Sequence, residues 1–310
     1  MITSIFNKTR PINYVILFVL LLFFFILYQD SNFINTSGLV VWLTKIGSFI
    51  LLISSIFLMH FIYNRNNLVK DNMYGTYFSF LFCCLFPQIF EDTNVVCSLF
   101  FLVLAFRRLI SLRSKLGIKQ KLFDSCVFIL IASLFYFWSI IFYLLVFYII
   151  LFQTSFSIKN WLIPFISIIL IGAIVIMFEM IFNAGYIFNL VDSIRLKFNY
   201  TDLKANKFEF IVLCFYTLLV VLFLFSSFIT TASRSVNQHS VYNILYLILI
   251  FSITIFVFMP VPNYALASFS FFPLAILGSN MIENIERKWI KETFLLVITI
   301  TVFIFYIFQL

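Results

Sequence analysis

Residues 91–121 read EDTNVVCSLFFLVLAFRRLISLRSKLGIKQK, and residues 122–152 read LFDSCVFILIASLFYFWSIIFYLLVFYIILF. An acidic pair, Glu91 and Asp92, precedes a short apolar run, and the densest cluster of Lys and Arg in the chain follows it. The second apolar run carries one charge, Asp124. Acidic, apolar, basic and apolar segments in this order predict membrane-crossing helices, with the basic segment held on the cytoplasmic side.

The composition of the whole chain supports this interpretation. Of its 310 residues, 64% are hydrophobic and 10% are charged, whereas soluble domains have about 45–50% apolar and about 25% charged residues. Continuous apolar runs of about 20 residues, the length that crosses a hydrocarbon core of about 30 Å, recur along the chain. We therefore predict an all-α, polytopic transmembrane helical bundle. The net charge of +8 fits cytoplasmic loops rather than a nucleic-acid partner.

We expect about 10–11 spans in a single integral membrane domain with a cytoplasmic N-terminus. The candidate spans are residues 11–28, 46–63, 74–90, 95–106, 122–137, 139–152, 161–182, 209–230, 241–259, 264–277 and 294–310. Between the first two, residues 29–45 are expected to form an external loop.

Whether the chain has 10 or 11 spans depends on the run 122–152. It is too long for one crossing and short for two, and both choices place nearly the same number of Lys and Arg inside. The aromatic cluster Phe135–Ser139 is typical of a membrane interface and favours two short spans that turn near Trp138. A single crossing would instead put the loop 183–208 in the cytoplasm.

Two sets of polar residues are candidate sites. Asp30, Glu91 and Asp92 are expected together at the outer surface, where carboxylates can act as general bases or hold a divalent metal. The alternative is that these acids are simply polar loop ends that meet water.

In the loop 183–208, apolar residues at helical spacing accompany four cations that could bind a lipid phosphate. These cations are Arg195, Lys197, Lys204 and Lys207. The alternative for this loop is an amphipathic tether.

Other classes of site are disfavoured. Two histidines, His60 and His239, are too few for an iron site built from several imidazoles, and the five cysteines show no C-x-x-C spacing. Asp124 can pair with Lys119 or Lys121 near the end of its run. No Lys or Arg is expected near the middle of a span, which argues against ion-coupled transport.

The segments LFPQIFEDTNVV (85–96), CSLFFLVLAFRRLISLRSKLGIKQK (97–121) and the run 122–152 resemble in their layout the core of GT-C glycosyltransferases. That resemblance, over about residues 87–183, implies transfer of a sugar from a polyprenyl-phosphate donor at the outer membrane face. It implies Asp30 as base or metal ligand, assisted by Asp92 and Glu91, and the basic loop as the lipid-phosphate site. The whole chain also resembles a group of uncharacterised multi-pass proteins of the bacterial inner membrane in Bacteroidota.

Two other functions fit the same sequence, so whether the protein is an enzyme stays open at this point. One is a non-catalytic membrane subunit of an envelope assembly, which would bind protein partners through its Phe-rich faces. The other is a permease for a lipid or apolar substrate. All three share the lipid bilayer as surroundings.

Overall fold

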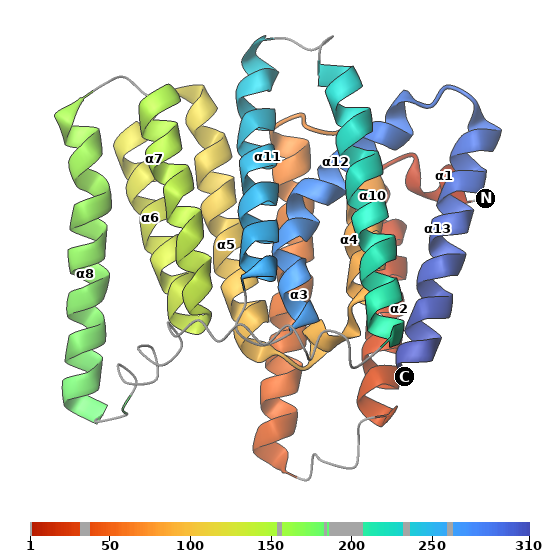
Figure 1. Cartoon of the computed structure of the whole chain (residues 1–310), viewed down its shortest axis with the longest axis horizontal. Helices are drawn as coiled ribbons and strands as arrows, with labels where there is room; N and C mark the ends of the chain where they lie inside the picture. The colour runs from red at the N-terminus through yellow and green to blue at the C-terminus, as the bar shows by residue number, and fades with distance from the viewer. Residues whose placement is uncertain are drawn as a thin grey trace.

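The computed structural model describes residues 2–31, 38–153, 157–182, 185, 207–231, 236–258 and 263–310. These residues form helices and no strand, which confirms the predicted all-α polytopic bundle (Figure 1). The elements of the first half are α1 (Ile2–Phe6), α2 (Pro11–Ser31), α3 (Leu39–Arg65), α4 (Tyr74–Leu85), η2 (Pro87–Phe90), α5 (Thr93–Ser111), η3 (Leu112–Ser114), α6 (Ile118–Phe135), η4 (Phe137–Phe142) and α7 (Tyr143–Phe152), where η marks a 3-10 helix. The second half contains α8 (Ile158–Phe182), α10 (Lys207–Thr231), α11 (Val236–Val257), η6 (Tyr264–Ser270), α12 (Phe271–Asn284) and α13 (Lys288–Gln309).

Eight helices in the described part are long and apolar enough to cross a membrane. Among them α8, α10 and α13 leave most of their apolar side chains exposed on the outside of the bundle. Such surfaces are stable only when lipid covers them. The protein is therefore a multi-pass membrane protein in a lipid bilayer, whereas the number of crossings and the side of the N-terminus remain predictions.

Hydrogen bonds between distant segments define the two ends of the bundle. At the first end, the backbone N–H of Met73 donates to Phe6 O over 2.9 Å, and the backbone N–H of Lys70 donates to Glu283 Oε1 over 2.9 Å. The turn between α5 and α6, with its cluster of Lys and Arg, lies at this same end, at the top of Figure 1. We term it the basic end.

The opposite end gathers carboxylates. Asn263 Nδ2 donates to Asp92 Oδ2 over 2.6 Å, and Gln88 Nε2 donates to Glu209 Oε1 over 3.2 Å. Gln29, the residue before Asp30, donates a hydrogen bond from its Nε2 to Phe90 O over 3.5 Å. We term this the acidic end, at the bottom of Figure 1.

Several helices extend beyond the predicted spans, and α3 and α5 are two examples. Helix α3 begins at Leu39 and not at Ile46, so residues 39–45 are helical rather than part of a loop. The apolar sequence LVVWLT continues the helix, and Lys45 within it is accommodated by a hydrogen bond from its Nζ to Gln29 Oε1 on α2. Helix α5 extends from Thr93 to Ser111, so it is longer than the predicted run 95–106 and includes the first two arginines of the basic cluster.

Proline and aromatic residues explain two breaks in the helices. Helix α4 ends at Leu85, and Pro87 is the first residue of η2, because proline lacks the N–H that would continue the helix and suits a first helical position. Helix α6 ends at Phe135, and the chain passes through η4 at the aromatic cluster before α7 begins. Helices α6 and α7 then run side by side in opposite directions (Figure 1).

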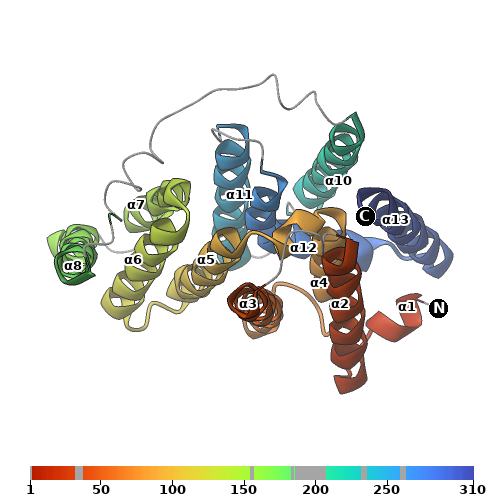
Figure 2. The ribbon, with the colours of Figure 1, turned by 90° about the horizontal axis from the view of Figure 1, so that it is seen from below.

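Helices α4 and α12 form the centre of the bundle, as the view in Figure 2 shows. Every residue of α4 is buried, and so is nearly all of the apolar segment Tyr264–Asn284. Two of their polar side chains bond to neighbouring helices: Tyr77 Oη lies 2.9 Å from Thr299 Oγ1 on α13, and Asn280 Nδ2 donates to Tyr242 Oη on α11 over 2.8 Å. Inside a bilayer such bonds between helices are required because water cannot replace them.

Two glycines allow the central helices to approach their neighbours. A Cβ on Gly75 of α4 would lie 2.9 Å from Tyr63 Cε2 and 3.0 Å from Ser279 Oγ. A Cβ on Gly278 of α12 would lie 2.8 Å from Phe223 Cε2 on α10. Small residues therefore set the spacing of the core although the sequence has no G-x-x-x-G motif.

Candidate functional site

A pocket of about 450 Å³ opens at the basic end between α3, α5, η3 and α6. Five cationic side chains line it, together with hydroxyl and amide groups and the ring of Phe61. The cations are Arg65, Arg107, Arg108, Arg113 and Lys121; the other polar residues are Asn66, Asn67, Ser111 and Ser114. We term this the basic pocket.

Helix ends and one tight turn bring these side chains together. Arg65 is the last residue of α3, and Arg107 and Arg108 lie in the last turns of α5. Lys115 (φ 52°) and Gly117 (φ 60°) are both left-handed, a conformation that glycine adopts without strain, and they return the chain into α6. Lys121 then faces back, and its Nζ donates to Ser111 O over 2.8 Å and to Ser114 Oγ over 2.7 Å.

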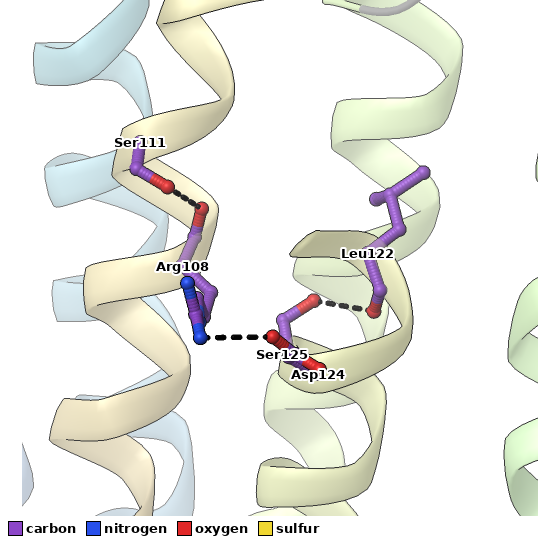
Figure 3. Close-up of polar contacts among 5 residues, drawn as sticks. All are labelled: Arg108, Ser111, Leu122, Asp124 and Ser125. Carbon is purple, nitrogen blue, oxygen red and sulfur yellow. Dashed lines mark hydrogen bonds and ion pairs between the residues drawn. The ribbon is translucent and has the colours of Figure 1, made fainter. Parts of the chain in front are cut away.

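One carboxylate offsets this positive charge. Arg108 Nη2 lies 3.1 Å from Asp124 Oδ2 on α6 (Figure 3). The two side chains are 41% and 33% exposed, so the pair contributes little to stability. The sequence suggested Lys119 or Lys121 as the partner of Asp124, and this was wrong because the charged end of α5 packs against α6. Within the described residues, no other carboxylate is paired with a pocket cation.

Arg65 and Arg107 are held over the same aromatic ring. Their guanidinium carbons lie 5.6 Å and 4.9 Å from the centroid of Phe61, and so are at most about 10.5 Å apart. Two positive charges at such a separation repel each other by about 1 to 2 kcal/mol near a protein surface. Stacking on Phe61 offsets part of this repulsion, and a bound anion would remove the rest.

The pocket therefore has the chemistry of an anion site. Guanidinium groups present a planar fork of N–H donors that matches phosphate and carboxylate oxygens. Four cations lack a carboxylate partner in the described part of the chain, and the amides of Asn66 and Asn67 add neutral donors. Phosphate, with more than one negative charge, fits this surplus better than a single carboxylate does.

The predicted acidic residues lie at the opposite end and have different surroundings. Asp92 caps α5, since its Oδ1 accepts from Val95 N over 3.1 Å, and its Oδ2 accepts from Asn263. Asp30 and Glu91 are exposed. The contact of Gln29 with Phe90 brings their two segments together, but the described residues contain no group of three or more His, Cys, Asp or Glu that could hold a metal ion.

The cap gives a prediction for Asp92. We expect Asp92→Ala to lower the free energy of unfolding by about 1 kcal/mol through loss of the cap, whereas Asp92→Ser should retain most of the stability. Thermal unfolding of the purified protein in detergent measures both. An equal loss for the two variants would contradict the capping role.

The predicted basic loop falls largely outside the described residues. Arg195, Lys197 and Lys204 are not described, and Lys207 is the first residue of α10 with its side chain not described. Their role in binding a lipid phosphate therefore stays a prediction.

His60 is more connected than its sequence context suggested. Its Nδ1 lies 2.8 Å from Thr76 Oγ1, and its Nε2 is hydrogen-bonded to Asn64 Nδ2 over 2.9 Å and to the hydroxyl of Tyr14. The spacing of His60 and Asn64, one turn apart on α3, was visible in the sequence. The contributions of α2 and α4 were not, because nothing local fixes which helices adjoin α3.

Comparison of the chain with curated proteins and with solved structures found no match. A family model, described as a family of unknown function, matches residues 1–310. The match extends over both ends of the bundle and the basic pocket. The chain thus belongs to DUF6427, a family of unknown function.

Proposed function

We propose that the protein binds the phosphate headgroup of an anionic lipid in its basic pocket. The observation that carries this proposal is the convergence of five cationic side chains from α3, α5, η3 and α6 on one pocket, where Asp124 pairs with Arg108 alone. We further propose that the bilayer is the bacterial inner membrane and that the basic end faces the cytoplasm. The excess of Lys and Arg at this end supports that orientation.

The exposed position of Phe61 supports a lipid, rather than a purely aqueous anion, as the ligand of the pocket. Phe61, which lies under two of the arginines, is 41% exposed on the outside of the bundle. The pocket is thus bordered by an apolar, lipid-facing side chain on one side and by the polar turn after α5 on the other. Arginine and lysine at the end of a span reach the level of lipid headgroups.

The sugar transfer implied by the resemblance to GT-C enzymes remains a prediction, as do a scaffold and a permease function. The basic pocket and the predicted catalytic acids lie at opposite ends of the bundle, a hydrocarbon thickness of about 30 Å apart. One donor headgroup could not contact both. Phosphate binding at the basic pocket therefore stands independently of catalysis at Asp30, Glu91 or Asp92.

A binding measurement on the purified protein tests the proposal. We expect a lipid with a phosphomonoester headgroup to bind more tightly than phosphatidylcholine in mixed micelles, as measured by native mass spectrometry. Raising the salt from about 0.05 M to about 0.5 M should weaken this binding severalfold, because exposed charges are screened. Equal binding of the two lipids, or no dependence on salt, would exclude the proposed function.

A further inference from the structure

A groove leads from the basic pocket along the outside of α2 and α3. A hollow of about 680 Å³ is lined by Tyr14, Phe57, His60, Phe61, Asn64 and Arg65. It shares Phe61 and Arg65 with the basic pocket. A small cavity of about 20 Å³ continues from it and shares Tyr14 and Phe57. The three hollows therefore follow one another along α3, and we refer to them together as the path.

The far part of the path is apolar. Leu17, Phe18 and Leu21 of α2 line it on one side, and Ile53 and Ile56 of α3 line it on the other. Helix α4 closes the back of the groove with Thr76 and Phe80. Figure 2 shows the backbones of these helices, with α4 next to both α2 and α3.

The length of the path suits one lipid chain. Ile53 lies 12 residues before Arg65 on α3, which corresponds to roughly 18 Å along a helix. One leaflet of a bilayer has a hydrocarbon thickness of about 15 Å. A chain that starts at the basic pocket would therefore remain in contact with the groove across its leaflet.

The middle of the path is polar. His60 is held by Tyr14, Asn64 and Thr76 from three helices. Asn64 directly precedes Arg65 on α3, and it lines the hollow with hydrogen-bonding capacity beyond its single bond to His60. The order along α3 is thus cationic, then polar and uncharged, then apolar. A lipid has the same order of phosphate, linkage and chain.

We propose that the ligand of the basic pocket is a single lipid with a phosphomonoester headgroup, whose chain lies in the groove between α2 and α3. This inference rests on the proposed function and adds the class of ligand and its orientation. A phosphomonoester carries close to two negative charges at neutral pH, which matches the surplus of cations better than a phosphodiester headgroup does. A free phosphate ion would leave the apolar part of the path without an occupant.

Filling the groove tests this inference. Ile53→Trp places a larger side chain in the path, and Ile50→Trp, on a 59% exposed position of the same helix that does not line the path, is the matched control. The probes are a long-chain alkyl phosphate, a butyl phosphate too short to reach Ile53, and inorganic phosphate. We expect Ile53→Trp to weaken binding of the long-chain probe by about fivefold, which is roughly 1 kcal/mol, and to leave butyl phosphate and the control unchanged.

The outcomes separate the two proposals. If both tryptophan variants bind the long-chain probe as the wild type does, the chain does not lie in the groove, although headgroup binding stands. If butyl phosphate and inorganic phosphate bind as tightly as the long-chain probe, the ligand is a soluble phosphate. If no phosphate probe binds the wild type, the proposed function fails and the inference with it.

A second measurement does not depend on a variant. An alkyl phosphate with a photoreactive group in its chain should label residues of α2 and α3 around Leu17, Phe18 and Ile53, as read by mass spectrometry of the digested protein. Labelling spread equally over the exposed helices α8, α10 and α13 would overturn the inference, because it would show ordinary contact with bulk lipid.

Discussion

Reversing the charge of both Arg65 and Arg107 should reduce the affinity for a phosphate headgroup by more than about a hundredfold. Each guanidinium supplies a charge-assisted hydrogen bond of about 1.5–3 kcal/mol, and two such losses correspond to at least about a hundredfold in the dissociation constant. The glutamates of Arg65→Glu/Arg107→Glu would also repel the anion. Native mass spectrometry or a titration with the long-chain alkyl phosphate measures the change.

A matched control separates the pocket from general attraction at the basic end. Arg287→Glu/Lys288→Glu changes the net charge by the same amount at two exposed residues that do not line the pocket. We expect this double variant to bind almost as the wild type does. If the two double variants lose affinity equally, the binding is diffuse attraction to a positive surface, and the basic pocket is not a site.

Arg65→Lys/Arg107→Lys separates charge from geometry. Lysine keeps the positive charge but has neither the planar fork nor the same stacking on an aromatic ring. We expect an intermediate loss of affinity, because stacking on Phe61 fixes the positions of both guanidinium groups in the pocket. If this variant kept the affinity of the wild type, charge alone would determine binding.

The fold class could be predicted from the sequence because it follows from composition. Apolar runs near the length of a membrane span leave few alternatives to a helical bundle. The breaks at Pro87 and near Trp138 also had local causes that can be read from single residues. The start of α3 could not be predicted, because Lys45 suggested a loop and its partner Gln29 lies on another helix.

The candidate site was predicted less well for a related reason. The cluster of residues 107–121 could be read from the sequence and was predicted to be a cytoplasmic anchor, but Arg65 joins it only because α3 and α5 end side by side. Sequence spacing predicts contacts within a helix and not between helices that are 40 residues apart. At Asp92, sequence does not distinguish a cap at the start of a helix, which the structure shows, from a catalytic carboxylate, which remains a prediction.

The second large effect concerns the packing of the core at Gly278. The added Cβ of Gly278→Val would lie 2.8 Å from Cε2 and 3.0 Å from Cζ of Phe223, and 3.2 Å from Cδ2 of Phe78. Both rings are fully buried, so neither can move aside without displacing α10 or α4. Overpacking of this kind costs typically about 1–3 kcal/mol and sometimes more. We expect a large drop in the temperature of unfolding in detergent.

Gly172 on α8 provides the matched control for this prediction, because a Cβ there would have no other atom within 4 Å. Gly172→Val should leave the unfolding temperature almost unchanged, since it removes only the flexibility of a glycine in a helix. Phe223→Leu should recover part of the stability of Gly278→Val, because the smaller side chain makes room for the added methyl groups, and a double-mutant cycle would show this coupling. If Gly278→Val is as stable as Gly172→Val, α10 and α12 are not in close contact at Gly278. Rescue by Phe223→Leu would instead establish that the two helices meet at this pair, next to Phe78 of α4.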